Sequence, residues 1–329
     1  MMAPPRRSTL AHGLARHLGL ALVSALLAVS VIGYGGLYLA TQGRLPGGFE
    51  FTSSLNNTMP LALAGLAQTM VVLTRGLDLS IGGIIDLSDA LAALYLGTTA
   101  ASMALASALI LLAGAVLGFV NGALVAYGRL PPILVTLATL AIFQGLAIRI
   151  LPQPGGAVPE GYTALLVNTG APYALFYVLA MMLFWAVLRR SRIGIALLAV
   201  GDDEAAASSN GIDPVVTKLV AYTLSGLIAA AAGLFLAAQA TAGDATTGNG
   251  YTLTSIVAVV LGGVSLFGGR GSGIGAILGA FVTTMIVNIL FFAHIDPLYQ
   301  SFYEGAFLVI AVVLAEGLGR LVRKRRARA

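Results

Sequence analysis

Long apolar runs separated by short polar breaks dominate this chain. A bilayer core of about 30 Å is crossed by about 20 apolar residues in a helix, so these runs predict membrane-spanning helices, about ten in all. The candidate spans are 18–40, 55–74, 81–99, 104–127, 131–151, 171–188, 215–238, 251–267, 274–293 and 302–318. The pattern therefore predicts an all-α, polytopic integral membrane protein.

The basic residues fix a predicted orientation for these spans. Lys and Arg concentrate in cytoplasmic loops. With the N-terminus inside, about ten spans place every one of the 18 Lys and Arg on the cytoplasmic side except Arg44 and Arg149. We therefore expect a basic cytoplasmic segment at 1–17, one transmembrane domain at 18–318 and a basic cytoplasmic tail at 319–329.

Composition supports a membrane protein and excludes several kinds of chemistry. Hydrophobic residues make up 58% of the chain and charged residues 9%, against about 25% charged in a soluble domain. The absence of cysteine excludes disulfides and thiolate chemistry. The three histidines, His12 and His17 in the basic leader and His294 beside a predicted loop, do not indicate a metal or acid–base centre. We expect no catalytic residue, no metal site and no cofactor on this chain. The net charge of +5 reflects topology and anionic lipid, and nucleic acid is not an expected partner.

The segment 189–214 is the most charged break between spans. Asp202 is placed to cap a short helix whose first turn holds Asp203 and Glu204, a favourable position for negative charge. Gly211 and Pro214 would end that helix. Such a helix could be a docking element for another protein or a plain surface loop, and the residues alone leave both open.

The segment 261–280 is the most glycine-dense stretch of the chain. Gly271, Gly275 and Gly279 recur every four residues, which predicts a helix face that another helix approaches closely. A phosphate-binding loop is excluded because the Gly-x4-Gly-Lys-Ser/Thr pattern is absent. Any ATP hydrolysis must therefore come from a different polypeptide.

Three aspartates lie close together in 76–94, in and beside an apolar span. Asp86 and Asp89 share a helix face with small residues, about 12 to 16 Å beyond Asp78 along the axis. A carboxylate at the bilayer centre costs about 2.5–3.5 kcal/mol on insertion scales, so it serves a pathway or a partner. Asp78 and Ser80 instead lie at the edge of the span, where they can accept from the first N–H groups of the helix, with Arg75 near enough to pair.

Other polar side chains inside the spans include Gln68, Asn121 and Asn288. Such amides can hydrogen-bond between helices, or they can line a path for a solute rich in hydroxyl groups. Both interpretations stay open for each residue. We include these three residues with Asp86 and Asp89 as candidates for a translocation path.

Three segments together resemble a known family. VVLTRGLDLSIGGIIDLSDALAAL, GDDEAAASSNGI and YTLTSIVAVVLGGVSLFGGRGSGIGAILGAFV are similar, in order and spacing, to signature regions of the ribose-type permeases of ABC importers. The resemblance implies the membrane subunit of a monosaccharide importer in the bacterial cytoplasmic (inner) membrane. It also implies three partners: a second permease copy or a paralogue, a separate ABC ATPase subunit, and an extracytoplasmic solute-binding protein.

The resemblance also implies roles for particular residues. It makes 204–211 an ATPase-coupling helix, and 76–80 and 269–270 a motif at the cytoplasmic face. The coupling candidates are Asp203, Glu204, Ala205, Ala206 and Gly211, and the motif candidates are Gly76, Asp78, Ser80, Gly269 and Arg270. Asp86 and Asp89 depart from the family pattern, which reads Ala-Leu-Ser-Gly-Ala or similar at 86–90.

The leading hypothesis is therefore a permease subunit for a monosaccharide, a polyol or a related polar solute, driven by ATP hydrolysis on a partner chain. The alternative is a proton-coupled secondary transporter in which Asp86 and Asp89 relay protons. A membrane enzyme needs a nucleophile and a base that this chain does not bring together in any recognisable motif.

Overall fold

The structure is a computed structural model that describes residues 7–296, 299, 302–303, 305–306 and 309. The described residues form helices and no strand. Their bounds are α1 Arg7–Gln42, α2 Gly48–Val72, α3 Ile81–Tyr95, α4 Ala100–Ala126, α5 Pro132–Ile150, α6 Glu160–Leu166, α7 Tyr173–Arg190, α8 Arg192–Asp202, α9 Glu204–Ser209, α10 Pro214–Ala240, α11 Asn249–Leu261 and α12 Gly273–Phe292.

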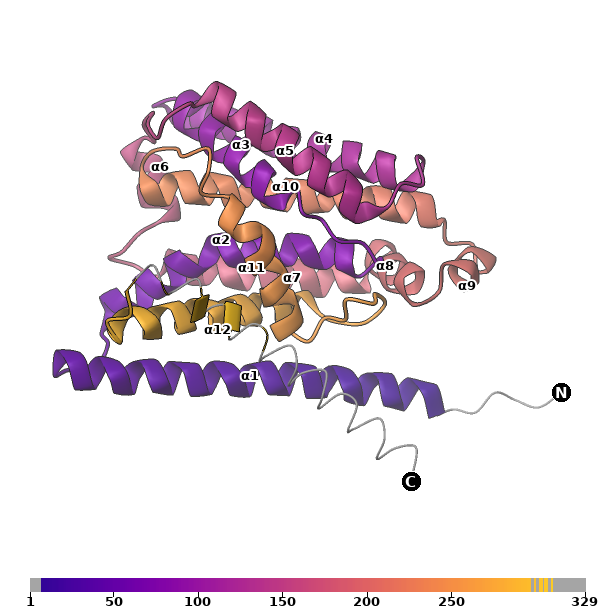
Figure 1. Ribbon diagram of the computed structural model, residues 1–329, viewed down its shortest axis with the longest axis horizontal. Helices are drawn as coiled ribbons and strands as arrows, with labels where there is room; N and C mark the ends of the chain where they lie inside the picture. Colours follow the sequence, from indigo (N-terminus) through magenta and orange to yellow (C-terminus); the bar gives the residue numbers. More distant parts are fainter. Residues whose placement is uncertain (1–6, 297–298, 300–301, 304, 307–308, 310–329) are drawn as a thin grey trace.

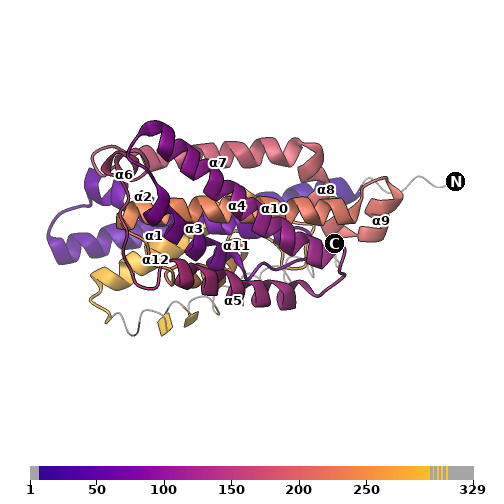
Figure 2. The same ribbon diagram turned by 90° about the horizontal axis from the view of Figure 1, so that it is seen from above.

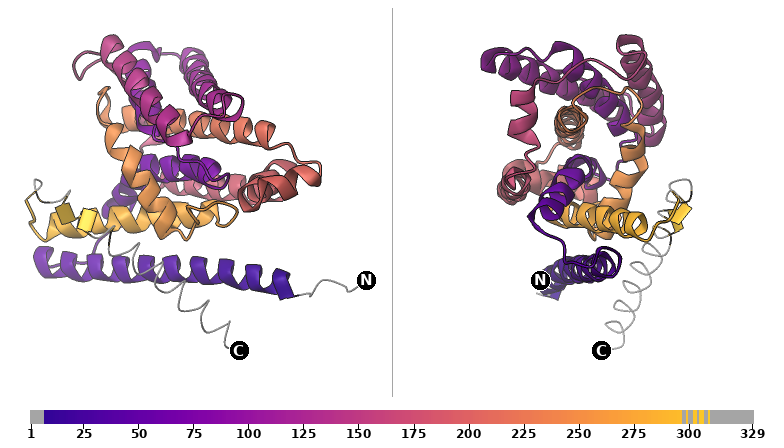
Figure 3. Two further views of the ribbon diagram at one scale, coloured as in Figure 1. Left: turned by 45° about the vertical axis from the view of Figure 1, so that its right-hand side comes forward. Right: turned by 90° about the vertical axis from the view of Figure 1, so that its left-hand side faces the viewer.

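The long helices run roughly side by side in a bundle (Figure 1). α1 lies along one edge and packs on α12, α2 and α11 occupy the middle, and α3, α4 and α5 form the opposite side. The short helices α8 and α9 lie together at one end of the bundle (Figure 2), which we call the α9 end. Seen along the bundle, α10 is enclosed by other helices (Figure 3).

Six of the described helices are long and apolar enough to cross a membrane, namely α1 from Gly19, α4, α5, α7, α10 and α12. The predicted all-α membrane protein is therefore confirmed. α2, α3 and α11 occupy further predicted spans. α3 has 15 residues and α11 has 13, which makes them about 22 and 20 Å long. Both are therefore shorter than the membrane core of about 30 Å. The span at 302–318 lies almost entirely outside the described residues, so the count of about ten and the orientation stay predictions.

Helix α10 forms the core because its small residues allow close approach. In its most apolar window 72% of the residues are buried, against 17% for α4. A side chain at Gly118 of α4 would run into the backbone carbonyl of Tyr222, and one at Gly226 of α10 into that of Gly114. The backbones of α4 and α10 are thus in direct contact, as small-residue faces permit in membranes.

The glycine-rich stretch packs as predicted at two of its three periodic positions. Side chains at Gly275 and Gly279 of α12 would collide with the carbonyls of Gly262 and Ala258, at the end of α11. The prediction is wrong for Gly271, because α12 begins only at Gly273. Gly271 instead lies in the preceding turn with φ +141°, where a side chain would be strained.

A charged cluster closes the connection between α1 and α2. Glu50 accepts hydrogen bonds from Arg44 Nη2 at 2.6 Å, Tyr38 Oη at 2.7 Å and the backbone N–H of Gly47 at 2.7 Å. The guanidinium of Arg44, followed by the Tyr38 hydroxyl, lowers the pKa of the Glu50 carboxyl to about 2. This turn lies at the end of the bundle opposite α9 (Figure 1).

Candidate functional site

The three segments that resemble family signatures meet at the α9 end. The backbone N–H of Gly269 donates to the carbonyl of Leu73 at 3.0 Å, which joins the turn before α12 to the end of α2. Arg75 Nε donates to the carbonyl of Gly201 in α8 at 2.7 Å, and its Nη2 donates to that of Asp202. Segments more than 120 positions apart in sequence therefore form one junction.

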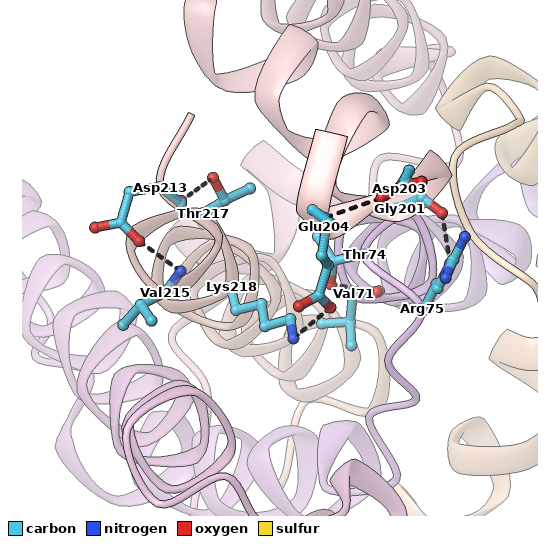
Figure 4. A network of polar contacts seen from close by, with 11 residues as sticks. Val71, Thr74, Arg75, Gly201, Asp203, Glu204, Asp213, Val215, Thr217 and Lys218 are labelled. Atoms are coloured by element: carbon cyan, nitrogen blue, oxygen red, sulfur yellow. Dashed lines mark hydrogen bonds and ion pairs between the residues drawn. The ribbon is translucent and has the colours of Figure 1, made fainter. Parts of the chain in front are cut away.

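The backbone of this junction is unusual at Arg75, Gly268 and Gly269. Arg75 has φ +63°, a left-handed conformation that is uncommon outside glycine and is held here by its two carbonyl contacts. Side chains at Gly268 and Gly269 would collide with Arg75 and Asp202 respectively, and the two glycines have φ +79° and +67°. The expected pairing of Arg75 with Asp78 does not occur, because the guanidinium turns toward α8 (Figure 4).

Helix α9 projects beyond this junction. Asp203 Oδ1 accepts from the backbone N–H groups of Ala205 at 2.9 Å and Ala206 at 3.0 Å. Asp203 is therefore the N-cap, and the prediction of Asp202 is wrong because 192–202 forms a separate helix, α8, that ends on it. Gly211 follows α9 with φ +81°, so the predicted end of the helix is correct.

One charged contact joins α9 to the central helix. Glu204 Oε1 lies 2.6 Å from Lys218 Nζ of α10 (Figure 4). Asp202 at the end of α8 also lies 3.9 Å from Arg270. Ala207 is buried, whereas Ala205 and Ala206 are exposed. Helix α9 therefore packs against the bundle with one side and leaves its other side exposed.

Asp78 is the centre of a buried polar network just inside the α9 end. Its carboxylate accepts from Ser80 N at 3.0 Å, Ser80 Oγ at 2.6 Å and Ser225 Oγ of α10 at 2.9 Å. Asn121 Nδ2 of α4 donates to Ser80 Oγ at 2.7 Å. The Gln68 amide, with its oxygen and nitrogen oriented to satisfy both partners, bonds the backbone of Asp78 at 2.9 and 3.3 Å.

This network ties α2, α3, α4 and α10 together, and every member is fully buried. Gln68 and Asn121, predicted to line a path, therefore lie with the motif residues Asp78 and Ser80. Ser80 precedes α3 but makes no side-chain cap bond to it, because its hydroxyl donates to Asp78 and accepts from Asn121.

Asp86 and Asp89 lie further along α3, with side chains 0% and 2% exposed respectively. Asp86 Oδ1 accepts from the backbone N–H of Gly248 at 2.5 Å, and Asp89 Oδ2 accepts from that of Asp244 at 2.7 Å. Gly248 immediately precedes α11. Asp86 therefore places a carboxyl oxygen at the N-terminal end of that helix, where backbone N–H groups lack a partner within the helix.

The segment 241–248, which we call the α10–α11 loop, is held at its other end by backbone contacts. Gly243 and Gly155 exchange two hydrogen bonds of 2.8 and 3.0 Å, and Val158 N donates to the carbonyl of Thr241 at 3.1 Å. The loop therefore reaches from the 152–159 segment down to the middle of α3, where the two carboxylates hold it.

Three buried polar atoms around this contact have no hydrogen-bond partner among the described residues: Asp86 Oδ2, Asp89 Oδ1 and Thr252 Oγ1. Thr252 belongs to α11 and its hydroxyl faces Gly82 of α3, one helical turn before Asp86. Buried polar atoms without partners cost stability, and these three lie together where α3, α11 and the segment 241–248 meet. Asn288 lies elsewhere, donating to Ser54 Oγ at 3.3 Å.

Sequence reasoning missed the partners of these residues. Ser225, Asp244 and Gly248 carry no motif, and they lie 147, 155 and 162 positions from the aspartates that they bond. In the part of the chain that the structure describes, no group of three or more His, Cys, Asp and Glu side chains is arranged to hold a metal ion.

The described residues form a bundle of apolar helices with buried carboxyl groups in its interior and a short exposed helix at one end, an architecture that fits a multi-pass membrane protein. The chain belongs to the ribose-type permeases of ABC importers, and it is a transport subunit and not an enzyme. The family that matches residues 51–312 is described as the branched-chain amino acid transport system / permease component.

Two groups of named relatives support this membership. The ribose import permease protein RbsC of Escherichia coli (strain K12) is 32% identical over 271 residues, which cover 79% of this chain and 83% of the relative. The autoinducer 2 import system permease protein LsrC is 34% identical in Shigella flexneri, covering 82% and 79% of the two chains. In Yersinia pseudotuberculosis it is 35% identical, covering 84% and 80%. No solved structure matches this chain.

Proposed function

We propose that this permease carries a monosaccharide, a polyol or a related sugar derivative across the bacterial cytoplasmic membrane, and that ATP hydrolysis on a separate subunit drives it. The observation that carries the proposal is the junction at the α9 end. Segments from α2, α8 and the turn before α12 meet there beside an exposed helix, as a site that transmits movement from a docked partner requires. The relatives named for ribose and autoinducer 2 import support a small polar solute.

In this proposal the α9 end faces the cytoplasm. Arg75, Lys218 and Arg270 all lie there, which agrees with the preference of basic residues for cytoplasmic loops. About ten spans would then place both termini on the same side. The charged cluster of Arg44 and Glu50 would face the outside, where a solute-binding protein delivers the substrate.

The ATPase subunit would dock on α9. Asp203 fixes the start of this helix, and Ala205 and Ala206 lie exposed on it. Movement of α9 would pass to α10 through the ion pair of Glu204 and Lys218. Movement of α8 would pass to the end of α2 through the hydrogen bond of Arg75 to Gly201. A second permease, either a copy of this chain or a paralogue, would complete the transporter and its central path.

Asp86 and Asp89 would act beside that path as the anchor of the α10–α11 loop. Each carboxyl group uses one oxygen on a loop N–H, and its other oxygen has no partner within the described part of the chain. A carboxylate oxygen is a strong acceptor for hydroxyl groups, so the pair suits a solute rich in hydroxyls once the loop moves. Asn288, Gln68 and Asn121 are weaker path candidates because each already bonds a protein group.

The same unpartnered oxygens are what the proton-coupled alternative would use, since buried carboxylates serve as proton relays in many transporters. The two mechanisms differ in their energy source. Proteoliposomes that contain this chain without an ATPase, but with a proton gradient, should take up no sugar or polyol. Gradient-driven uptake in those vesicles would overturn the ABC mechanism.

The docking assignment is tested by Glu204→Lys in proteoliposomes that also contain the cognate ATPase and binding protein. We expect ATP-dependent uptake to fall at least about tenfold, because a lysine faces Lys218 and reverses the charge of the docking helix. Glu204→Gln loses only a surface ion pair worth about 0–1 kcal/mol, and it should remain folded. Glu160→Lys, on the far short helix α6, controls for the effect of a Glu-to-Lys change on folding, insertion and ATPase binding. Normal uptake by Glu204→Lys with the ATPase still bound would refute the assignment.

A further inference from the structure

A cavity of about 180 Å³ lies between the last turns of α7 and the start of α12, lined by Trp185, Ala186, Arg189, Arg190 and Ile274. None of these residues belongs to the coupling junction or to the carboxylate pair. Its volume is several times the ~30 Å³ that one water takes up in the liquid. A cavity lined by two arginines and an indole is unusual on an apolar bundle.

The arginines make the cavity positively charged. Arg190 is exposed, and its guanidinium forms no hydrogen bond or ion pair with the residues that the structure describes. Arg189 fixes the wall, since its Nη1 donates to the carbonyl of Gly271 at 2.8 Å. A free guanidinium beside an anchored one presents several N–H donors in the planar arrangement that suits a phosphate group.

The position of the cavity favours a lipid. The outer face of α7 just before the arginines is apolar and exposed, with Leu183 65% and Val187 62% accessible. Trp185 lies about 7.5 Å along the axis from Arg190 and is 1% exposed, so the indole closes the inner side of the cavity. Arg190 lies at the end of an apolar helix, where arginine is favoured at the membrane surface. Trp185 Nε1 donates to Ser272 Oγ at 3.1 Å, which holds the ring at the back of the cavity.

We infer that this cavity binds the phosphate of an anionic phospholipid, with Arg190 as the direct ligand and Arg189 and Trp185 as its wall. The acyl chains would lie along the apolar face of α7. The side of the membrane follows from the orientation in the proposed function, under which this is the cytoplasmic leaflet. Basic cavities between membrane helices on that side are known to take lipid headgroups.

Trp185 offers a direct test because it is the only tryptophan in the chain. The purified full-length protein in detergent is titrated with phosphatidylglycerol or phosphatidylcholine, each with brominated acyl chains, and quenching of the Trp185 fluorescence is followed. Wild-type protein should be quenched at several-fold lower concentrations of the anionic lipid. Equal quenching by both lipids would overturn the inference, and this comparison needs no variant.

Variants then assign the ligand. Arg190→Gln should weaken the anionic lipid about fivefold with unchanged binding of phosphatidylcholine, whereas Arg192→Gln, a neighbouring arginine outside the cavity, should leave both unchanged. No effect of Arg190→Gln would contradict the inference. Recovery of fluorescence by inorganic phosphate, but not by chloride at the same ionic strength, would assign the site to free phosphate and overturn the lipid. No solute or ATPase is used, so failure here is separate from failure of the proposed function.

Discussion

The anchoring of the α10–α11 loop by Asp86 and Asp89 makes a quantitative prediction. Replacing Asp86 by Ala removes the acceptor of the buried Gly248 N–H, which now lies 2.5 Å from Oδ1. A hydrogen bond to a charged group contributes about 1.5–3 kcal/mol. Because about 1.4 kcal/mol is a factor of ten, the population of the open loop should rise about 10- to 100-fold.

The opening can be measured with a single thiol, because the chain has no cysteine. Ala245 lies within the loop and is 3% exposed, packed among apolar residues that include Leu87. An Ala245→Cys protein should react slowly with maleimide, at a rate set by the open fraction of the loop. Adding Asp86→Ala or Asp89→Ala should speed the reaction with maleimide about 10- to 100-fold. Asp86→Asn keeps a neutral acceptor and should speed it by less than about tenfold.

Ser88→Ala is the matched control, since Ser88 lies between the two aspartates on α3, is buried and has no hydrogen bond to the loop in the described structure. Full labelling in denaturant checks that the thiol itself is equally reactive in each protein. If Asp86→Ala and Asp89→Ala react at the rate of Ser88→Ala, the carboxylates do not hold the loop and the reasoning fails.

Two further predictions concern the frame around these sites. The pKa of Glu50 is about 2 in the folded protein, against about 4.3 in the unfolded chain. The ionised carboxylate therefore stabilises the α1–α2 turn fully above about pH 4.3, and this stabilisation is lost as the pH falls toward 2. The protection factor of the amides at 43–50 against hydrogen exchange, from which the intrinsic pH dependence of exchange has been divided out, should fall over that window in the wild type and stay constant in Glu50→Gln; no difference between the two proteins would count against the cluster. Gly118→Leu should cost at least the ~1–3 kcal/mol typical of overpacking, because it forces α4 off α10, whereas Gly145→Leu meets open space. Size-exclusion profiles after heating compare the two, and equal stability would contradict the close contact.

Several features of this protein follow from local sequence. Apolar runs predict where helices lie because a membrane leaves the backbone no other partner for its N–H and C=O groups, and helices occupy the predicted spans that the structure describes. The short helix near 204–209 and its end at Gly211 were also predictable. The local sequence predicts the cap one residue early, because nothing local shows that Asp202 completes another helix.

Contacts between distant segments were not predictable in this way. Arg75 lies three residues from Asp78, and proximity in sequence favoured a pair, yet the left-handed turn at Arg75 points its side chain at carbonyls in α8. Gln68 and Asn121 were grouped with Asp86 and Asp89 as polar residues inside spans. The fold separates them, placing the amides around Asp78 and the carboxylates against the α10–α11 loop.

The sequence by itself determined the class of protein, since hydrophobic periodicity and charge placement are local consequences of transferring a chain from water to lipid, and family signatures are contiguous. The sequence also shows that Asp86 and Asp89 lie within an apolar span, where a carboxyl group is unfavourable unless it has a partner or a function. Only the tertiary structure decided that partner, because a buried carboxylate is stabilised by whichever N–H groups the fold brings within about 3 Å, and Asp244 and Gly248 reach it from more than 150 positions away.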